Sequence, residues 1–253
     1  MTENENNNST GIVFGRNSVL ELIKSERSID KIYIQKGLHD SIIGKIINEA
    51  KQHGVPVVEA DKRKLDEMAS GIVHQGIAAT TSTIDYVSVE DILQIAKEKN
   101  EKPFIVICDN INDPHNLGAI IRTAEAAGVH GIIIPKRNSV SITATVVKAS
   151  AGATAHVTVA RVSNLVNTIE LLKKAGVWVY ALEANGTPYY KEKLNAPSAF
   201  VLGSEGEGVS RLIKDRSDYI LSIPMYGKIS SLNVSAAAAV VLMEAAKHRN
   251  ETE

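Results

Sequence analysis

The chain has 253 residues, of which 44% are hydrophobic and 23% are charged. This is the composition of an ordinary globular protein with room for two modest domains, and it argues against a disordered chain or a membrane protein. The formal net charge is −1. This value excludes a protein that coats nucleic acid through overall positive charge, although it leaves room for a local basic patch.

The remaining global features predict a soluble cytoplasmic protein. Residues 1–10 are polar and lack the apolar core of a signal peptide, so we expect a disordered tail there. The single cysteine, Cys108, lies in an apolar run and is expected to be a buried thiol in a reducing compartment. No apolar run is long enough to span a bilayer, and the seven histidines lack the spacing of metal ligands. We therefore expect neither membrane contact nor a metal.

Residues 11–85 are predicted to form a small α/β domain, because short helical and alternating patterns follow one another there. A polar helical pattern over residues 86–103, ending at Lys102-Pro103, predicts a linker. The predicted elements of the domain, in chain order, are a helix at 15–24, a strand at 31–35, a helix at 39–53, a strand at 55–59, a helix at 61–68 and a strand at 76–83.

Residues 104–250 have a different hydrophobicity pattern, in which continuous apolar runs alternate with helical stretches. Strands that are apolar on both faces and alternate with helices are typical of a mainly parallel sheet covered on both sides. Ligands of such sheets bind beyond the carboxyl ends of the strands, so the loops there are the candidate site. The six runs are FIVICD, GIIIP, AHVTVA, VWVYAL, AFVLG and YILSI.

The first such loop follows FIVICD and leads into a helix. Asp113 followed by Pro114 is typical of a helix start. The helix carries Asn116 and Arg122, and Gly118 lies one turn before Arg122, where we expect it to leave space beside the guanidinium. Taken alone, Arg122 could equally be an arginine that extends from a buried helix to the surface.

The second loop, Gly203-Ser204-Glu205-Gly206-Glu207-Gly208, follows AFVLG. Its spacing matches neither the dinucleotide fingerprint nor the P-loop, and its two acids argue against a polyphosphate ligand. In isolation it could be no more than a tight turn between a strand and a helix.

The third loop runs from Ile223 to Ser235 and leads into an alanine-rich helix. We expect Ser230 or Ser231 to cap this helix and Ser231 to share a face with Ser235. Capping explains one serine, but it does not explain Ser231, Asn233 and Ser235 together.

In this order, the three loops resemble the three motifs of the SpoU/TrmH branch of the SPOUT RNA methyltransferases. Asn116 and Arg122 match the first motif, residues 203–208 match the second, and Ser231-Leu232-Asn233-Val234-Ser235 match the third. The resemblance implies a trefoil-knotted, parallel-sheet catalytic domain, a homodimer through that domain, and S-adenosylmethionine as methyl donor.

The N-terminal part of the chain is similar to the substrate domain of those members of the branch that act on ribosomal RNA. That domain in turn resembles small ribosomal proteins that bind RNA. The similarity lies in residues 13–21 and 74–79. It favours methylation of a guanosine in 23S ribosomal RNA over the tRNA guanosine-18 enzymes, although a tRNA substrate stays open. It also implies RNA contacts at Arg16, Asn17, His74 and Gln75, for which a surface arginine and a turn-stabilising histidine are the alternative interpretation.

For the catalytic domain, the resemblance implies that the loops around Gly203, Ile223 and Leu232 bind S-adenosylmethionine. It also implies a role for Arg122 as the base, but a guanidinium rarely gives up its proton. We therefore expect Arg122 to clamp a phosphate or to stabilise developing alkoxide charge. The other expected catalytic residues are Asn116, which orients the ribose or Arg122, Glu205, which orders the loops, and Ser231, Asn233 and Ser235, which bind substrate.

Two other classes of protein fit the sequence less well. A Rossmann oxidoreductase needs a glycine fingerprint after its first strand, whereas FIVICD is followed by Asn-Ile-Asn-Asp-Pro-His-Asn. A non-catalytic ribosome-assembly factor with the same fold would be indicated by loss of Arg122, Glu205 or the polar residues of the third motif, and all of these are present.

Overall fold

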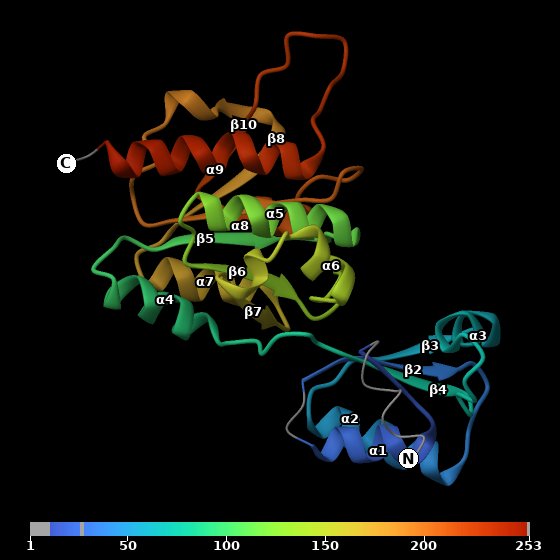
Figure 1. The fold of residues 1–253 in the computed structure, drawn as a ribbon. Coiled ribbons are helices and arrows are strands. Elements are labelled where there is room, and N and C mark those ends of the chain that lie inside the picture. The colour runs from blue at the N-terminus through green and yellow to red at the C-terminus, as the bar shows by residue number, and fades with distance from the viewer. Residues whose placement is uncertain (1–10, 26–27, 252–253) are drawn as a thin grey trace. The chain divides into compact units, whose positions relative to one another are not determined.

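The computed structural model describes residues 11–25 and 28–251, and the chain divides into two compact units after Asp85 (Figure 1). The predicted tail at residues 1–10 lies outside the described residues. Within the described part of the chain, no helix is both long and apolar enough to cross a membrane.

The first unit is a four-stranded mixed sheet with helices on both faces. The strands lie in the order β1-β4-β2-β3, in which β4 runs antiparallel to both of its neighbours and β2 runs parallel to β3. Helices α1 and α2 pack on one face of the sheet and α3 packs on the other. The elements are β1 (Ile12–Phe14), α1 (Arg16–Lys24), β2 (Ile29–Gln35), α2 (Ser41–Gln52), β3 (Val57–Ala60), α3 (Lys62–Ala69) and β4 (Ile77–Thr81).

The second unit is a six-stranded sheet in which every pair of neighbours is parallel, as the apolar runs predict. The strand order is β10-β8-β9-β5-β6-β7. The strands are β5 (Phe104–Cys108), β6 (Gly131–Pro135), β7 (Thr158–Val162), β8 (Trp178–Pro188), β9 (Ser198–Leu202) and β10 (Tyr219–Ser222). The helices are α4 (Val89–Glu98), α5 (Pro114–Ala126), α6 (Ala144–Ala149), α7 (Leu165–Lys174), α8 (Arg211–Arg216) and α9 (Val234–Asn250).

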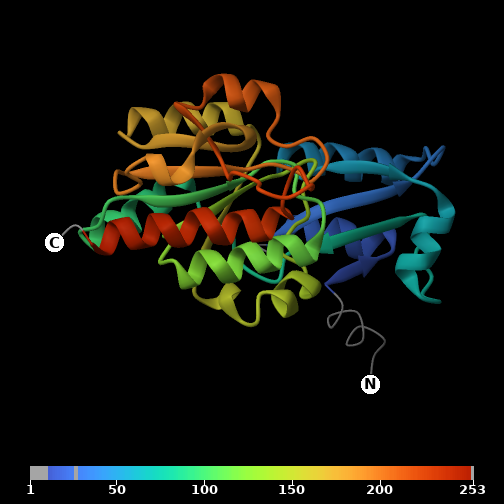
Figure 2. The ribbon, with the colours of Figure 1, turned by 90° about the horizontal axis from the view of Figure 1, so that it is seen from above.

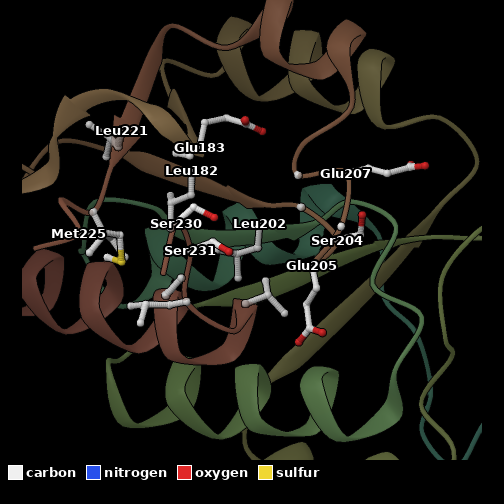
Figure 3. Close-up of a pocket in the computed structure, with 18 residues that line it drawn as sticks. Leu182, Glu183, Leu202, Ser204, Glu205, Glu207, Leu221, Met225, Ser230 and Ser231 are labelled. Atoms are coloured by element: carbon white, nitrogen blue, oxygen red, sulfur yellow. The ribbon is translucent and has the colours of Figure 1, made fainter. Parts of the chain in front are cut away.

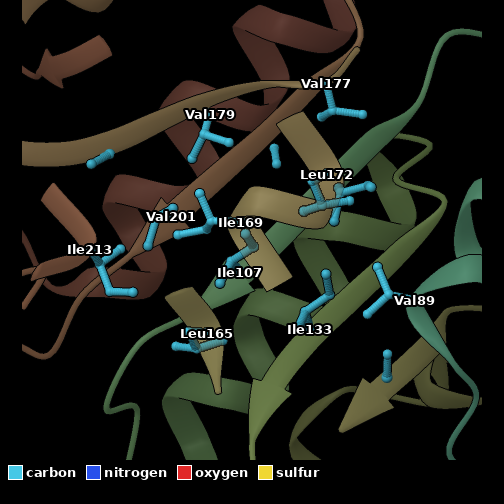
Figure 4. Packing of buried hydrophobic residues seen from close by; sticks show 14 of the residues in the cluster. Val89, Ile107, Ile133, Leu165, Ile169, Leu172, Val177, Val179, Val201 and Ile213 are labelled. Carbon is cyan, nitrogen blue, oxygen red and sulfur yellow. The ribbon is translucent and has the colours of Figure 1, made fainter. Parts of the chain in front are cut away.

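Helices cover both faces of this sheet. On one face, residues of α4, α7 and α8 close a core over the strands, in which Ile169, Leu172 and Ile107 are fully buried (Figure 4). On the other face, α5 lies beside α9 (Figure 2) and also packs against α6. Cys108 is buried in the middle of the sheet, as expected from its apolar neighbours, and burial raises the pKa of its thiol to about 12.

The linker expected over residues 86–103 is wrong, because most of this segment belongs to the core of the second unit. Val89, Ile92 and Ala96 of α4 are buried. Ile92 packs so closely on the start of β6 that a Cβ atom at Gly131 would lie 2.6 Å from the Ile92 side chain. The polar residues 99–102 that follow α4 give residues 86–103 a polar majority, which hides the apolar stripe that holds α4 to the sheet.

Candidate functional site

A cavity of about 320 Å³ opens where β9 and β10 end and beside the middle of β8 (Figure 3). Its lining combines the glycine-rich loop with apolar side chains of the strands and of the segment that leads into α9. The lining residues are Leu182, Glu183, Ala184, Leu202, Gly203, Ser204, Glu205, Gly206, Glu207, Gly208, Leu221, Ile223, Met225, Ser230, Ser231, Leu232, Val234 and Ala237.

The glycine-rich loop has a tight and specific shape. Ser204 and Gly208 exchange two backbone hydrogen bonds, with N···O distances of 3.1 and 2.9 Å. A Cβ atom at Gly203 would overlap the backbone of Gly208, and Gly208 itself has a φ of +68°. Glycine is required at both positions, because no other residue lets the two ends of the loop come so close.

Two carboxylates, one on β8 and one directly after β5, hold the segment that follows this loop. Glu183 Oε1 accepts a hydrogen bond from Val209 N at 2.7 Å, and Asp109 Oδ2 accepts one from Ser210 N at 2.7 Å. Lys214 on α8 lies 3.5 Å from the other oxygen of Glu183. The two acids satisfy backbone N–H groups just before α8. Sequence analysis missed both, although each directly follows an apolar strand run.

Three polar side chains from the three loops meet beside the cavity. Asn116 Nδ2 on α5 donates a hydrogen bond to Glu205 Oε1 at 2.9 Å. Asn233 Nδ2 donates to the same oxygen, and also to Asn116 Oδ1 at 2.9 Å. We call Asn116, Glu205 and Asn233 the polar cluster. These contacts join residues that are far apart in the sequence.

Asn233 caps α9, which corrects the expectation that Ser230 or Ser231 does so. Its Oδ1 accepts hydrogen bonds from Ser235 N at 2.9 Å and from Ala236 N. Ser235 Oγ donates to the same oxygen at 2.6 Å. Ser231 precedes the helix, so it cannot share a helical face with Ser235. The hydroxyl of Ser235 supports Asn233, while Ser231 lines the cavity.

Arg122 lies apart from the polar cluster. It follows Asn116 by six residues on α5, which places it about 9 Å along the axis and about 120° around it. Gly118, one turn before Arg122, packs on α6, where its Cβ would lie 2.5 Å from Ala149 Cβ. The expected space beside the guanidinium is therefore occupied by α6. Arg122 is exposed, and among the described residues it has no hydrogen-bond or ion-pair partner.

The three residues predicted to bind the cofactor, Gly203, Ile223 and Leu232, all line the cavity. Their role in binding stays a prediction. Leu232 is 42% exposed, so its side chain is available at the mouth of the cavity. No group of histidine, cysteine or acidic side chains within the described residues could hold a metal ion.

In the first unit, the predicted RNA contacts form local structure. Arg16 pairs with Asp40 at 2.8 Å, and its backbone N donates to Gln75 Oε1 at 3.2 Å. His74 is buried, accepts a hydrogen bond from Gly76 N at 3.0 Å and contacts Asp66, which agrees with a turn-stabilising histidine. Asn17 and Gln75 are exposed. RNA contact by these four residues stays a prediction.

The fold and the cavity define an α/β protein that binds a small molecule beside the carboxyl ends of parallel strands. Comparison with known proteins identifies its family. The family model of the SpoU rRNA methylases matches residues 103–243, and the model for RNA 2′-O ribose methyltransferase substrate binding matches residues 12–87. The chain therefore belongs to the SpoU/TrmH family of RNA methyltransferases, which confirms the resemblance.

Relatives match almost the whole chain. YacO of Bacillus subtilis (strain 168), assigned to the TrmH family of tRNA/rRNA methyltransferases, is 42% identical over 239 residues, which cover 94% of this chain and 96% of YacO. A Staphylococcus haemolyticus protein with the same assignment is 45% identical over 241 residues, covering 95% of this chain and 96% of the relative.

Solved structures share the fold. The SpoU methyltransferase AviRb from Streptomyces viridochromogenes, in complex with AdoMet, matches with a TM-score of 0.59 at 21% identity, covering 94% of this chain and 90% of AviRb. An AdoMet-bound rRNA methyltransferase from Sinorhizobium meliloti matches with a TM-score of 0.59 at 22% identity, covering 98% and 91%. These similarities confirm the parallel α/β catalytic fold.

Proposed function

We propose that this protein transfers the methyl group of S-adenosylmethionine to a ribose 2′-hydroxyl of structured RNA, a guanosine of 23S ribosomal RNA being the expected target. Membership of the SpoU/TrmH family supports the reaction class. The match of the first unit to the substrate-binding model supports an RNA substrate. The preference for ribosomal RNA over tRNA follows from the resemblance of the first unit to the ribosomal RNA members.

The cavity fits S-adenosylmethionine in size and chemistry. Its volume of about 320 Å³ lies within the range of about 300–1,000 Å³ typical of small-molecule sites. Leu202, Leu221 and Ile223 offer an apolar surface for an adenine ring, and the glycine-rich loop offers backbone groups. The carboxylate of Glu207 in the same loop suits a ligand that carries sulfonium and ammonium charges and is unsuited to a polyphosphate.

The polar cluster is the single observation that carries the proposal. Two amide donors hold Glu205 Oε1, which fixes the glycine-rich loop to the starts of α5 and α9. These contacts support the loop-ordering role that we propose for Glu205. When bound, S-adenosylmethionine supplies an electrophilic methyl group. The chain itself must place the ribose oxygen in line with that group, and a rigid frame of three loops suits this positioning role.

Arg122 is proposed to bind a phosphate next to the reacting ribose. Its exposed guanidinium, which has no partner among the described residues, is available for such a contact. A lysine keeps the charge but loses the planar fork that pairs with phosphate. We expect Arg122→Lys to lower kcat/KM for RNA while leaving S-adenosylmethionine binding intact. Near-normal turnover of that variant contradicts both bidentate clamping and an arginine-specific base.

We further propose a homodimer through the second unit, a trefoil knot in that unit and a cytoplasmic location, as the resemblance implies. The small side chains Ala236, Ala237 and Ala239 lie partly exposed on α9, and such a surface allows close helix packing. Sedimentation of the purified protein tests the dimer.

Mapping 2′-O-methyl groups across ribosomal RNA and tRNA, with and without this gene product, tests the reaction and the substrate together. Loss of one ribosomal methyl group supports the proposal. Loss of a tRNA methyl group instead identifies a tRNA methyltransferase.

A non-catalytic assembly factor with this fold is the second candidate function. It predicts binding of labelled S-adenosylmethionine without transfer to either class of RNA. The complete polar cluster favours the enzyme.

A further inference from the structure

One long stretch of the second unit has no negative charge. Residues 126–169 contain no aspartate and no glutamate, whereas they contain Lys136, Arg137, Lys148 and Arg161. This segment therefore carries a net positive charge in a chain whose net charge is −1. An excess of one sign of charge within one segment creates a local field that the overall composition conceals.

The loop that carries Lys136 and Arg137 is fixed at both ends. Lys136 N donates to Val162 O at 2.8 Å, and Arg161 donates to Lys136 O at 3.4 Å while it stacks on Tyr86. At the other end of the loop, Val140 N donates to Ile111 O at 2.9 Å. The backbone under Lys136 and Arg137 is thus held in place, which lowers the entropy lost when a partner binds.

Lys148 comes from the neighbouring helix, α6, which packs against α5 through Ala149 and Gly118. Arg137 and Lys148 are exposed and Lys136 is half-buried. Within the part of the chain that the structure describes, none of these three side chains has an ion-pair or hydrogen-bond partner. We call Lys136, Arg137 and Lys148 the basic surface. Arg122 follows Gly118 by four residues, so it lies on the same face of α5 as the contact with α6.

The loop that carries Lys136 and Arg137 lies along the same edge of the sheet as the cavity. The cavity lies where β9 and β10 end, whereas Lys136 and Arg137 directly follow the end of β6. In the strand order, only β5 separates β9 from β6. Neighbouring strands lie about 4.8 Å apart, so β9 and β6 are about 10 Å apart. A polymer whose reacting group enters the cavity can therefore extend over the basic surface within a few of its units.

We propose that the basic surface binds the phosphate backbone of the substrate RNA beside the methylated nucleotide. This inference rests on the proposed function, because it assigns the RNA a path away from the cavity across the ends of β5, β6 and β7. Contacts of this kind position a nucleic acid without reading its bases. They also make binding depend on salt, since each neutralised phosphate releases counterions.

The experiment compares two double variants of the full-length protein. Arg137→Gln with Lys148→Gln removes two charges from the basic surface and leaves Arg122 and the polar cluster unchanged. Lys99→Gln with Lys174→Gln is the matched control, because both lysines are exposed and follow or end helices at the opposite edge, just before β5 and β8. Binding to the RNA, total 23S ribosomal RNA or total tRNA, is measured across a salt series, and methyl transfer is measured separately.

For the basic-surface variant, the slope of log K against log salt is expected to become shallower by about 0.7–0.9 per lost phosphate contact. KM for RNA rises, and binding of S-adenosylmethionine is unchanged. The control variant behaves like the wild type. An unchanged salt slope in the basic-surface variant overturns the inference, as does a change confined to its oligomeric state in sedimentation.

Failure of the proposed function gives a different result. In that case the wild type transfers no methyl group to either RNA, while the binding series still decides whether the basic surface contacts a phosphate backbone.

Discussion

Asn233 Nδ2 donates a hydrogen bond to Asn116 Oδ1 at 2.9 Å, although the two residues are 117 positions apart. The two ends of the Asn233 amide act differently. Its oxygen caps α9, whereas its nitrogen binds Asn116 and Glu205. Because the helix cap fixes which end is the oxygen, the nitrogen must point at the other members of the polar cluster.

These two actions of Asn233 can be separated by substitution. Serine is a good helix cap but has no second donor, so Asn233→Ser is expected to keep stability within a few tenths of a kcal/mol. The same variant is expected to lose most methyl transfer, because Glu205 loses one of its two donors. Alanine removes the cap as well, and Asn233→Ala should cost about 1 kcal/mol of stability. Thermal denaturation and transfer assays of both variants check this. Normal transfer by Asn233→Ser would show that the amide does not organise the site.

Two glycines of the glycine-rich loop provide a matched pair. A Cβ atom at Gly203 would overlap the backbone of Gly208, whereas a Cβ atom at Gly206 meets nothing within 4 Å. Gly203→Ala is therefore expected to displace the loop and to weaken S-adenosylmethionine binding by at least about tenfold, or 1.4 kcal/mol. Gly206→Ala should bind like the wild type. Calorimetric titration of both variants measures the difference, and equal affinities contradict the rigid loop.

Most strands of the second unit could be predicted from its sequence. Strands that are buried on both faces need continuous apolar runs, so β5 and β9 can be recognised from the runs FIVIC and SAFVL. Likewise, Asp113 followed by Pro114 predicts the start of α5, and the Asp113 side chain does accept from His115 N at 2.9 Å. The linker expected at α4 follows from the polar residues 99–102 after the helix, which give residues 86–103 a polar majority.

The polar cluster could be expected only as three separate motifs. Periodicity describes neighbours along the chain, whereas the bond between Asn116 and Asn233 depends on how α5 and α9 pack. For the same reason, the sequence could not predict that the carboxylates of Asp109 and Glu183 bind the segment before α8, because these contacts depend on the order of the strands. Arg122 is the opposite case, since the motif that groups it with Asn116 says nothing of the 120° between them on the helix.

The buried His130 makes stability depend on pH. Its Nδ1 accepts a hydrogen bond from Phe104 N at 3.0 Å, and its Nε2 lies 3.0 Å from Glu101 Oε2. Burial lowers the pKa of His130, although Glu101 opposes the shift. The unfolded chain therefore binds the proton more readily, and stability is lost as pH falls below the ordinary histidine pKa of about 6.5.

Urea denaturation at pH 7.5 and pH 5.5 measures this effect against variants. His130→Gln should reduce the pH dependence, whereas His39→Gln should preserve it because His39 is exposed. The same pH dependence in His130→Gln as in the wild type would assign it to other groups.

Gly118 sets how closely α5 approaches α6, and with it the spacing between Arg122 and the basic surface. Alanine favours a helix over glycine by about 0.5–1 kcal/mol. At Gly118, however, the new Cβ would lie 2.5 Å from Ala149 Cβ and 2.9 Å from Val146 O. Overpacking of this kind costs about 1–3 kcal/mol, so Gly118→Ala should destabilise the second unit.

Gly44 provides the control. A Cβ atom at Gly44 on α2 would meet nothing within 4 Å, so Gly44→Ala should stabilise the first unit. Hydrogen exchange reports on each helix separately. Faster exchange in α5 and α6 of the first variant, with slower exchange in α2 of the second, is the expected result, and unchanged exchange in α6 contradicts the close packing.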